Sequence, residues 1–280
     1  MSCDWAANQL EEAPMSIALT VTHLDPCEPE GMALGLAGAL GFASNYGSAL
    51  TALVFPAEVV GEKTATRTEA EIASAEANAA ITITTAAERA GVAVDIRTRS
   101  SFAHGIGAVL ADQMRVADLG LLSVAPEPAI GVRHLIAGAL FDSGRPLLLM
   151  PQAAPLGTIQ RALVAWDATP AAVRALHAAL PLLRRAGEVR ILSVSDDKEV
   201  RPGQSGIAVT HHLARHGIAA TFESIERGDK GVFAALTSAA PADLLVMGVV
   251  RHHPVHSLVF GSATGDLLQA APPLPVLAMA

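Results

Sequence analysis

The sequence predicts an α/β protein made of two tandem doubly wound domains, each a five-stranded parallel sheet with helices on both faces. Strand-like apolar runs alternate with helix-like segments along the whole chain. These runs are almost continuously apolar, which is typical of parallel strands that are covered on both faces. The order of segments is also repeated, so we expect one domain over residues 15–150 and a second over residues 159–280.

The internal repeat is clearest when residues 91–124 are compared with residues 217–250. Each segment begins with a glycine, Gly91 or Gly217, and continues with strand-like residues, a polar turn and helix-like residues. Each then reaches an Ala-Asp-Leu triplet, beginning at Ala117 or Ala242, followed by a buried apolar run. The joint between the repeats is expected at 150–158, which is rich in Pro, Ala and Gly.

The individual elements follow from these runs in chain order. Apolar and β-branched runs predict the strands, and longer Ala-rich segments between them predict the helices, including one that contains the β-branched run ITIT. In the first half, we expect strands at 16–22, 50–58, 92–98, 117–124 and 146–151, and helices at 30–47 and 66–91. In the second half, we expect strands at 161–167, 189–194, 219–225, 243–248 and 275–279, with a helix at 169–180.

Composition excludes several classes of function. Of the 280 residues, 51% are hydrophobic, only 4% are aromatic, and the net charge is -8 without any basic block. A nucleic-acid partner is therefore not expected. The two cysteines, Cys3 and Cys27, provide no disulfide framework, and the acidic N-terminus resembles neither a signal peptide nor a membrane anchor. We expect a cytoplasmic protein with no membrane partner.

A glycine-bearing loop follows the apolar run at 243–248 and reads MGVVRHHPVHSLVFGSATGDLLQ. Backbone N–H groups in a loop between a strand and a helix can surround a phosphate group. Ligands in doubly wound sheets bind outside the carboxyl ends of the strands. Asp167, Val194 and Gly248 are all expected at such ends.

These residues resemble the universal stress protein family. Its nucleotide-binding members have Gly, two residues, Gly, nine residues and Gly-Ser/Thr after the fourth strand. This spacing is matched by Gly248, Arg251, Gly261 and Ser262, although Arg251 replaces the second glycine. The resemblance also matches Asp167 and Val194 to residues that contact the adenosine part of the ligand.

The resemblance implies a Rossmann-like fold of the adenine nucleotide α-hydrolase type and an adenine nucleotide, ATP or AMP, as ligand. It also implies that the last strands of the two halves face each other as an intramolecular pseudo-dimer, with a homodimer as a further option. The implied function is a regulatory stress-response protein with unknown protein partners. The alternatives are a tandem scaffold that binds no nucleotide, and a slow ATPase or another nucleotide-dependent enzyme.

Each candidate residue also has a structural interpretation. Gly248 could form a tight turn, Gly261 could open a helix, and Ser262 could cap that helix. Asp167 could cap the helix at 169–180. The Arg251 side chain could either pair with phosphate groups or block them.

The first half departs further from the nucleotide-binding pattern. Ser123 and Pro126 occupy the places of Gly248 and Arg251, and the loop is expected to run to Gly138, with Ala139 in place of the serine. Proline also removes a backbone donor. Asp25 is an approximate match to Asp167. We therefore expect that this half binds no nucleotide.

No motif in the sequence identifies catalytic or metal-binding residues. The chain has no nucleophile-and-base motif and no Walker P-loop, so we expect that it is not an enzyme. His212 and His216 lie four residues apart on an expected helix, and His252, His253 and His256 crowd the glycine-bearing loop. Because no carboxylate or cysteine accompanies them at ligand spacing, we expect exposed or capping histidines and no metal.

Overall fold

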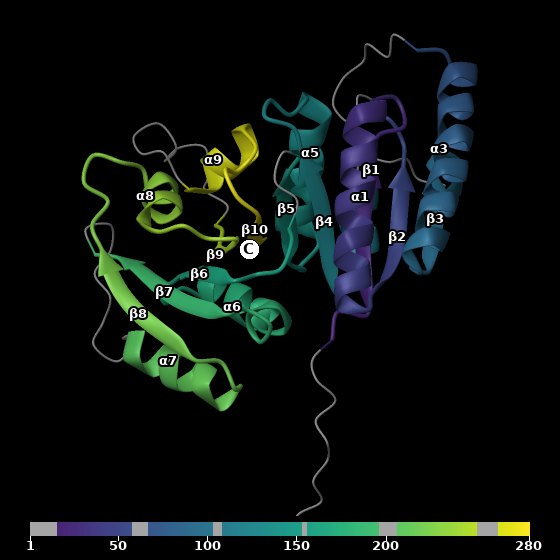
Figure 1. Cartoon of the computed structure of the whole chain (residues 1–280). Coiled ribbons are helices and arrows are strands. Elements are labelled where there is room, and N and C mark those ends of the chain that lie inside the picture. Colours follow the sequence, from purple (N-terminus) through teal and green to yellow (C-terminus); the bar gives the residue numbers. More distant parts are fainter. Residues whose placement is uncertain (1–15, 58–66, 103–107, 153–155, 196–205, 251–262) are drawn as a thin grey trace, which may run out of the picture.

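The computed structural model describes residues 16–57, 67–102, 108–152, 156–195, 206–250 and 263–280. Ten strands form one continuous sheet in the order β3-β2-β1-β4-β5-β10-β9-β6-β7-β8. Figure 1 shows the first half, purple to teal, beside the green-to-yellow second half. The strand order within each half is 3-2-1-4-5, which makes each half doubly wound, as the sequence predicts.

The strands and helices alternate in both halves. The first half contains β1 Leu19–Leu24, α1 Pro29–Tyr46, β2 Ala49–Val54, α3 Glu69–Ala90, β3 Val94–Thr98, the short 3-10 helix η1 Arg99–Ser101, α4 Val109–Met114, β4 Leu119–Val124, α5 Ile130–Asp142 and β5 Leu147–Pro151. The second half contains β6 Arg161–Ala165, α6 Pro170–Leu183, β7 Glu188–Val194, α7 Gly206–Arg215, β8 Ala220–Ile225, α8 Val232–Ala239, β9 Leu244–Gly248, α9 Ala263–Gln269 and β10 Val276–Met279.

All ten predicted strands are present, and every strand pair within a half is parallel. The boundaries differ where local chemistry ends an element early. The strand predicted at 50–58 ends at Val54, just before Pro56, which has no N–H to offer a neighbouring strand. Helix α1 ends at Tyr46, and Gly47 caps it with a φ of 69° that glycine readily adopts.

Helices cover both faces of the sheet, and the α-helices of the described residues divide into two sets of four. One apolar cluster joins the sheet to α1, α3, α6 and α7, and a second joins it to α4, α5, α8 and α9. Each cluster contains buried residues from both halves of the chain. The hydrophobic core is therefore shared across the joint on both faces of the sheet.

The joint itself is an antiparallel strand pair. Leu148 of β5 lies opposite Leu277 of β10, and Leu149 lies opposite Val276. This pairing confirms the predicted meeting of the two last strands inside one chain. It satisfies the inner edges of both half-sheets, which would otherwise present unpaired N–H and C=O groups. Because the pair is antiparallel, the strands of the two halves run in opposite directions. The carboxyl ends of one half's strands therefore lie beside the amino ends of the other half's strands.

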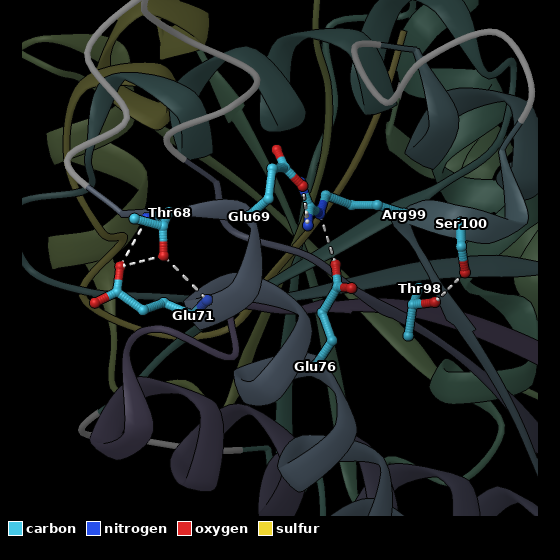
Figure 2. Close-up of polar contacts among 7 residues, drawn as sticks. All are labelled: Thr68, Glu69, Glu71, Glu76, Thr98, Arg99 and Ser100. Atoms are coloured by element: carbon cyan, nitrogen blue, oxygen red, sulfur yellow. Dashed lines mark hydrogen bonds and ion pairs between the residues drawn. The ribbon is translucent and has the colours of Figure 1, made fainter.

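Helix α3 is fixed at its first turn and again where β3 ends (Figure 2). Thr68 and Glu71 form a capping box, in which Oγ1 of Thr68 accepts from the Glu71 N–H and Oε2 of Glu71 accepts from the Thr68 N–H. Arg99 then donates through Nε to the buried Glu76 at 2.8 Å and pairs with the exposed Glu69 at 3.1 Å. These contacts attach the long helix to the outermost strand of the first half.

The Ala-Asp-Leu triplets have the same structural role in both halves. The Asp118 carboxylate accepts the N–H groups of Ala18 and Leu19 at 2.8 and 3.0 Å. The Asp243 carboxylate likewise accepts the N–H groups of Gln160 and Arg161 at 2.9 and 2.8 Å. Each aspartate therefore joins the start of its half's fourth strand to the start of its first.

Candidate functional site

The candidate site lies at the carboxyl edge of three adjacent strands of the second half, β9, β6 and β7. Val164 of β6 lies opposite Val246 of β9 and Ile191 of β7. Following this register to the strand ends brings Asp167, Val194 and Gly248 to the same edge. The structure therefore brings these three sequence-predicted residues to one edge of the sheet, outside neighbouring strands.

Asp167 organises the turn between β6 and α6. Its Oδ1 accepts both the N–H of Thr169 at 3.1 Å and the Thr169 hydroxyl at 2.6 Å. The Thr169 Oγ1 in turn accepts the N–H of Ala172, which makes Thr169 the N-cap of α6. The alternative interpretation, in which Asp167 itself caps this helix, is therefore wrong, since Asp167 positions the residue that does.

Ala168, inside this turn, has a left-handed backbone. Its φ is 56°, and it is the only non-glycine residue with positive φ among the described residues. This conformation costs an L-residue about 1–2 kcal/mol relative to the right-handed form. Such strain is stored most often at functional sites. In the first half the corresponding residue is Pro26, whose ring excludes a positive φ.

Gly248 makes a close backbone contact with the start of α6. A Cβ atom at this position would lie 2.4 Å from the N atom of Ala172 and 2.5 Å from the carbonyl carbon of Ala171. Gly248 is thus required for packing between β9 and α6, a role that differs from the tight turn of its structural interpretation. This close contact also keeps the carboxyl end of β9 near the turn formed by Asp167.

Val194 is the last residue of β7 and lies opposite Ile225 of β8. Its side chain is half-buried in the apolar cluster beneath α8 and α9. The pairing with β8 continues one residue further, because the N–H of Ser195 donates to the carbonyl of Ile225 at 2.9 Å. The strand end is therefore held in place on one side by β8 and on the other by β6.

The remaining predicted site residues, Arg251, Gly261 and Ser262, lie outside the described residues, as do His252, His253 and His256. Helix α9 begins at Ala263, the residue after Ser262. The strand before this loop ends at Gly248, where the sequence predicts it. The two ends of the predicted phosphate loop therefore lie at a strand end and a helix start.

At the corresponding carboxyl ends of the first half's strands, the aspartate is bound by main-chain N–H groups. Asp25 lies six residues after Leu19, as Asp167 does after Arg161, so the two aspartates are true counterparts. Asp25 accepts the N–H of Cys27 through Oδ1 and the N–H of Ala57 through Oδ2, both at 2.8 Å. Both carboxylate oxygens are thus bound by the main chain.

The segment after β2 also reaches the start of α5. A Cβ atom on Gly131 would lie 1.8 Å from the carbonyl oxygen of Ala57, so the two backbones are in direct contact. The predicted loop from Ser123 to Gly138 is wrong, because α5 already begins at Ile130 and includes both Gly138 and Ala139. Its buried side, which includes Leu135, Ile136 and Leu140, favours a helix over a loop.

The prediction of exposed or capping histidines is wrong for His212, which lies on α7, and for His216, which directly follows that helix. His212 and His216 are half-buried, and they form a ring cluster with His177 of α6. Within the described ranges, no group of three or more His, Cys, Asp or Glu side chains is arranged to hold a metal ion. Nor does any helix in these ranges combine the length and apolarity needed to cross a membrane.

Comparison with known proteins supports the architecture. No protein-family model matches the sequence, and no curated protein matches it significantly. Among solved structures, a universal stress protein from Archaeoglobus fulgidus DSM 4304 is similar, with a TM-score of 0.68, 19% identity, and coverage of 92% of this chain and 97% of that one.

Two structures from Pseudomonas aeruginosa are also similar. One, from strain UCBPP-PA14, is described as belonging to the universal stress proteins, with a TM-score of 0.58, 18% identity, and coverage of 94% and 93%. The other, a functionally unknown protein from strain PAO1, has a TM-score of 0.57, 17% identity, and coverage of 94% and 92%. The chain has the α/β fold of the universal stress proteins over nearly its whole length.

Some residues that shape the candidate site or the fold around it were not identified from the sequence. Thr169 precedes Pro170, and this Thr-Pro pair is a signal for a helix N-terminus that could have identified the cap. The repeated Ala-Asp-Leu triplets carried a signal for Asp118 and Asp243. The left-handed backbone of Ala168 had no signal, because alanine rarely adopts it.

Proposed function

We propose that this chain is a universal stress protein of the cytoplasm that binds an adenine nucleotide, ATP or AMP, in its second half. Binding is regulatory, and occupancy changes the conformation or the assembly of the protein without dedicated catalysis. The observation that carries the proposal is the shared edge of Asp167, Val194 and Gly248, beside the loop that contains Arg251, Gly261 and Ser262.

The geometry of this edge suits a nucleoside. Asp167 holds a carboxylate at the switch point of the sheet, where hydroxyl groups of a sugar are ordinary hydrogen-bond partners. The main chain at Val194 is held by neighbouring strands, so it offers a rigid surface for a base. The N–H groups around Gly261 and Ser262, before α9, supply donors of the kind that bind phosphate groups.

The runner-up function is a tandem scaffold that acts through protein partners and binds no nucleotide. One observation favours it in the first half, where Asp25 is bound to Ala57 and the Ala57 carbonyl lies against Gly131. If the loop at Arg251 closed the second half in a similar way, the whole chain would be such a scaffold. An ATPase is a third candidate, which turnover of ATP to ADP would reveal.

The direct test is mass spectrometry of small molecules released from purified protein, followed by calorimetry with ATP. We expect a co-purifying adenine nucleotide or a measurable affinity for ATP, without production of ADP. Asp167→Ala is expected to weaken binding by about tenfold or more, since a hydrogen bond to a charged group is lost. Absence of any nucleotide, together with absence of ATP binding, would favour the scaffold.

The size and charge of the Arg251 side chain should determine how the phosphate groups are accommodated. A bulky side chain has replaced a glycine whose value is its small size, so we expect Arg251 to occlude the pocket in part. Arg251→Gly should then strengthen ATP binding. Weaker binding by the variant, with a flatter response to salt, would instead show that the guanidinium pairs with phosphate.

A further inference from the structure

Three histidine rings contact one another between two neighbouring helices of the second half. His177 lies on α6, His212 on α7, and His216 follows the last residue of α7. The rings of His177 and His212 are stacked, with centroids 5.1 Å apart and planes inclined by 14°. His216 meets His212 edge-on at 4.8 Å and 70°. We call these three residues the imidazole cluster.

Arg184 contacts one ring of the cluster. Nη2 of Arg184 lies 3.4 Å from Nδ1 of His216, and its Nε donates to the His216 carbonyl at 3.3 Å. A guanidinium group only donates hydrogen bonds, so Nδ1 of His216 is the acceptor in this contact. A proton on Nδ1 would remove the acceptor and set a cation against a cation.

His212, in the middle of the cluster, also disfavours a proton. Its pKa is lowered from the ordinary value of 6.5, first by burial and then by the positive charges of His177, His216 and Arg215. Its Nε2 atom is buried and has no hydrogen-bond partner among the described residues. A charge on this ring would therefore lose its hydration without gaining a partner.

The strands beneath α7 offer no compensating carboxylate. Side chains alternate between the two faces of a strand, and the apolar cluster with α7 contains Val189 and Ile191 of β7 and takes in Ala220 of β8. By this alternation, the residues on that face of the two strands are Val189, Ile191, Ser193, Ala220, Phe222 and Ser224. The charged residues Glu188, Arg190 and Glu223 belong to the opposite face. Arg184, Arg215 and the three histidines are thus the titratable groups found at the cluster within the described chain.

We propose that the imidazole cluster is a proton-sensitive latch between α6 and α7. With neutral rings, the stack and the Arg184 contact hold α7 in place. Because the folded state binds the proton less well than the unfolded segment, this contribution is complete above pH 6.5 and is lost as the pH falls through the lowered pKa of His212. Mild acid therefore loosens α7.

The loosening is local to the outer part of the second half. Helix α7 has ten residues and buries only Gly206, Val209 and Leu213, so few apolar contacts oppose its release. The joint between β5 and β10 lies elsewhere in the sheet and contains no histidine. The latch is independent of nucleotide binding, since none of its residues belongs to the candidate site.

Hydrogen exchange of α7 in the intact chain tests this latch. After correction for the intrinsic rate, we expect exchange to rise about threefold or more between about pH 7.5 and about pH 5.5, while β4 and β9 remain protected. His212→Gln should abolish most of this response. His211→Gln is the matched control, because it removes the exposed neighbouring histidine of the same helix and should leave the response unchanged.

Two results would overturn this proposal. One is exchange in α7 that does not depend on pH in the wild-type chain, and the other is the same pH response in wild type and His212→Gln. Should His212→Gln fail to fold, His212→Phe replaces it, because phenylalanine keeps a stacking ring but cannot take up a proton. A pH response as large in His212→Phe as in wild type would then contradict the proposal.

Discussion

At the scale of single residues, Asp118 and Asp243 are the clearest product of the internal repeat. Each carboxylate accepts two main-chain N–H groups at the start of its half's first strand. Hydrogen bonds to a charged group are stronger than those between neutral groups. We expect Asp118→Ala to lower the free energy of unfolding by about 1–3 kcal/mol.

Asp118→Asn should cost less than Asp118→Ala, because the amide oxygen remains an acceptor. Asp112→Ala is the control, since this carboxylate is exposed and pairs only with Arg115 in the described contacts. Urea unfolding of the four proteins measures the difference. Equal stability of Asp118→Ala and Asp112→Ala would contradict the role assigned to the triplet.

His23 supplies a second prediction for a single residue. It is half-buried, its ring packs on that of Phe55 with centroids 4.4 Å apart, and its Nε2 lies 2.8 Å from the Phe55 carbonyl. Burial lowers its pKa below 6.5, against the opposing effects of the carbonyl and of Asp25. The stability linked to this group is therefore present above pH 6.5 and is lost as the pH falls through the lowered pKa.

His23→Gln keeps a donor for the Phe55 carbonyl but cannot be protonated in this range. We expect the free energy of unfolding of wild type to fall more steeply in mild acid than that of the variant, as measured by urea unfolding at several pH values. His134→Gln is a matched control on the exposed side of α5. A wild-type pH profile parallel to that of His23→Gln would refute the neutral buried state.

At the scale of elements, two glycines should respond to the same substitution with opposite signs. Gly248→Ala would place a Cβ atom 2.4 Å from the main chain of α6 and should destabilise the protein by about 1–3 kcal/mol. Gly138 lies inside α5, and a Cβ atom there would meet no atom within 4 Å. Gly138→Ala should therefore stabilise it by about 0.5–1 kcal/mol. Thermal unfolding measures both, and equal effects would contradict the packing role of Gly248.

The elements also show what the sequence could and could not predict. Continuous apolar runs identified every strand, and strand ends correctly grouped Asp167, Val194 and Gly248. The start of α5 was missed because alignment with Gly261 and Ser262 placed a loop where Leu135, Ile136 and Leu140 bury a helical face. The second hydrogen bond of Asp25 could not be predicted either, since its donor is the N–H of Ala57, in the segment that follows β2.

At the scale of the whole molecule, the two halves should unfold together. The antiparallel pair of β5 and β10 makes one sheet, and buried residues of both halves share each apolar cluster. Arg185 of the second half also lies over the Tyr46 ring of the first, 4.7 Å from its centroid. We expect one calorimetric transition whose van't Hoff and calorimetric enthalpies agree. Two separate transitions would show that the halves are energetically independent.

The central claim is that one fold, repeated twice, provides a nucleotide site in its second half alone. The most direct measurement is the stoichiometry of ATP binding by equilibrium dialysis of wild type, Asp167→Ala and Asp25→Ala, each first checked for folding. The account predicts one nucleotide per chain, weakened by Asp167→Ala and retained in Asp25→Ala. Two equal sites per chain, or a single site lost only in Asp25→Ala, would contradict it.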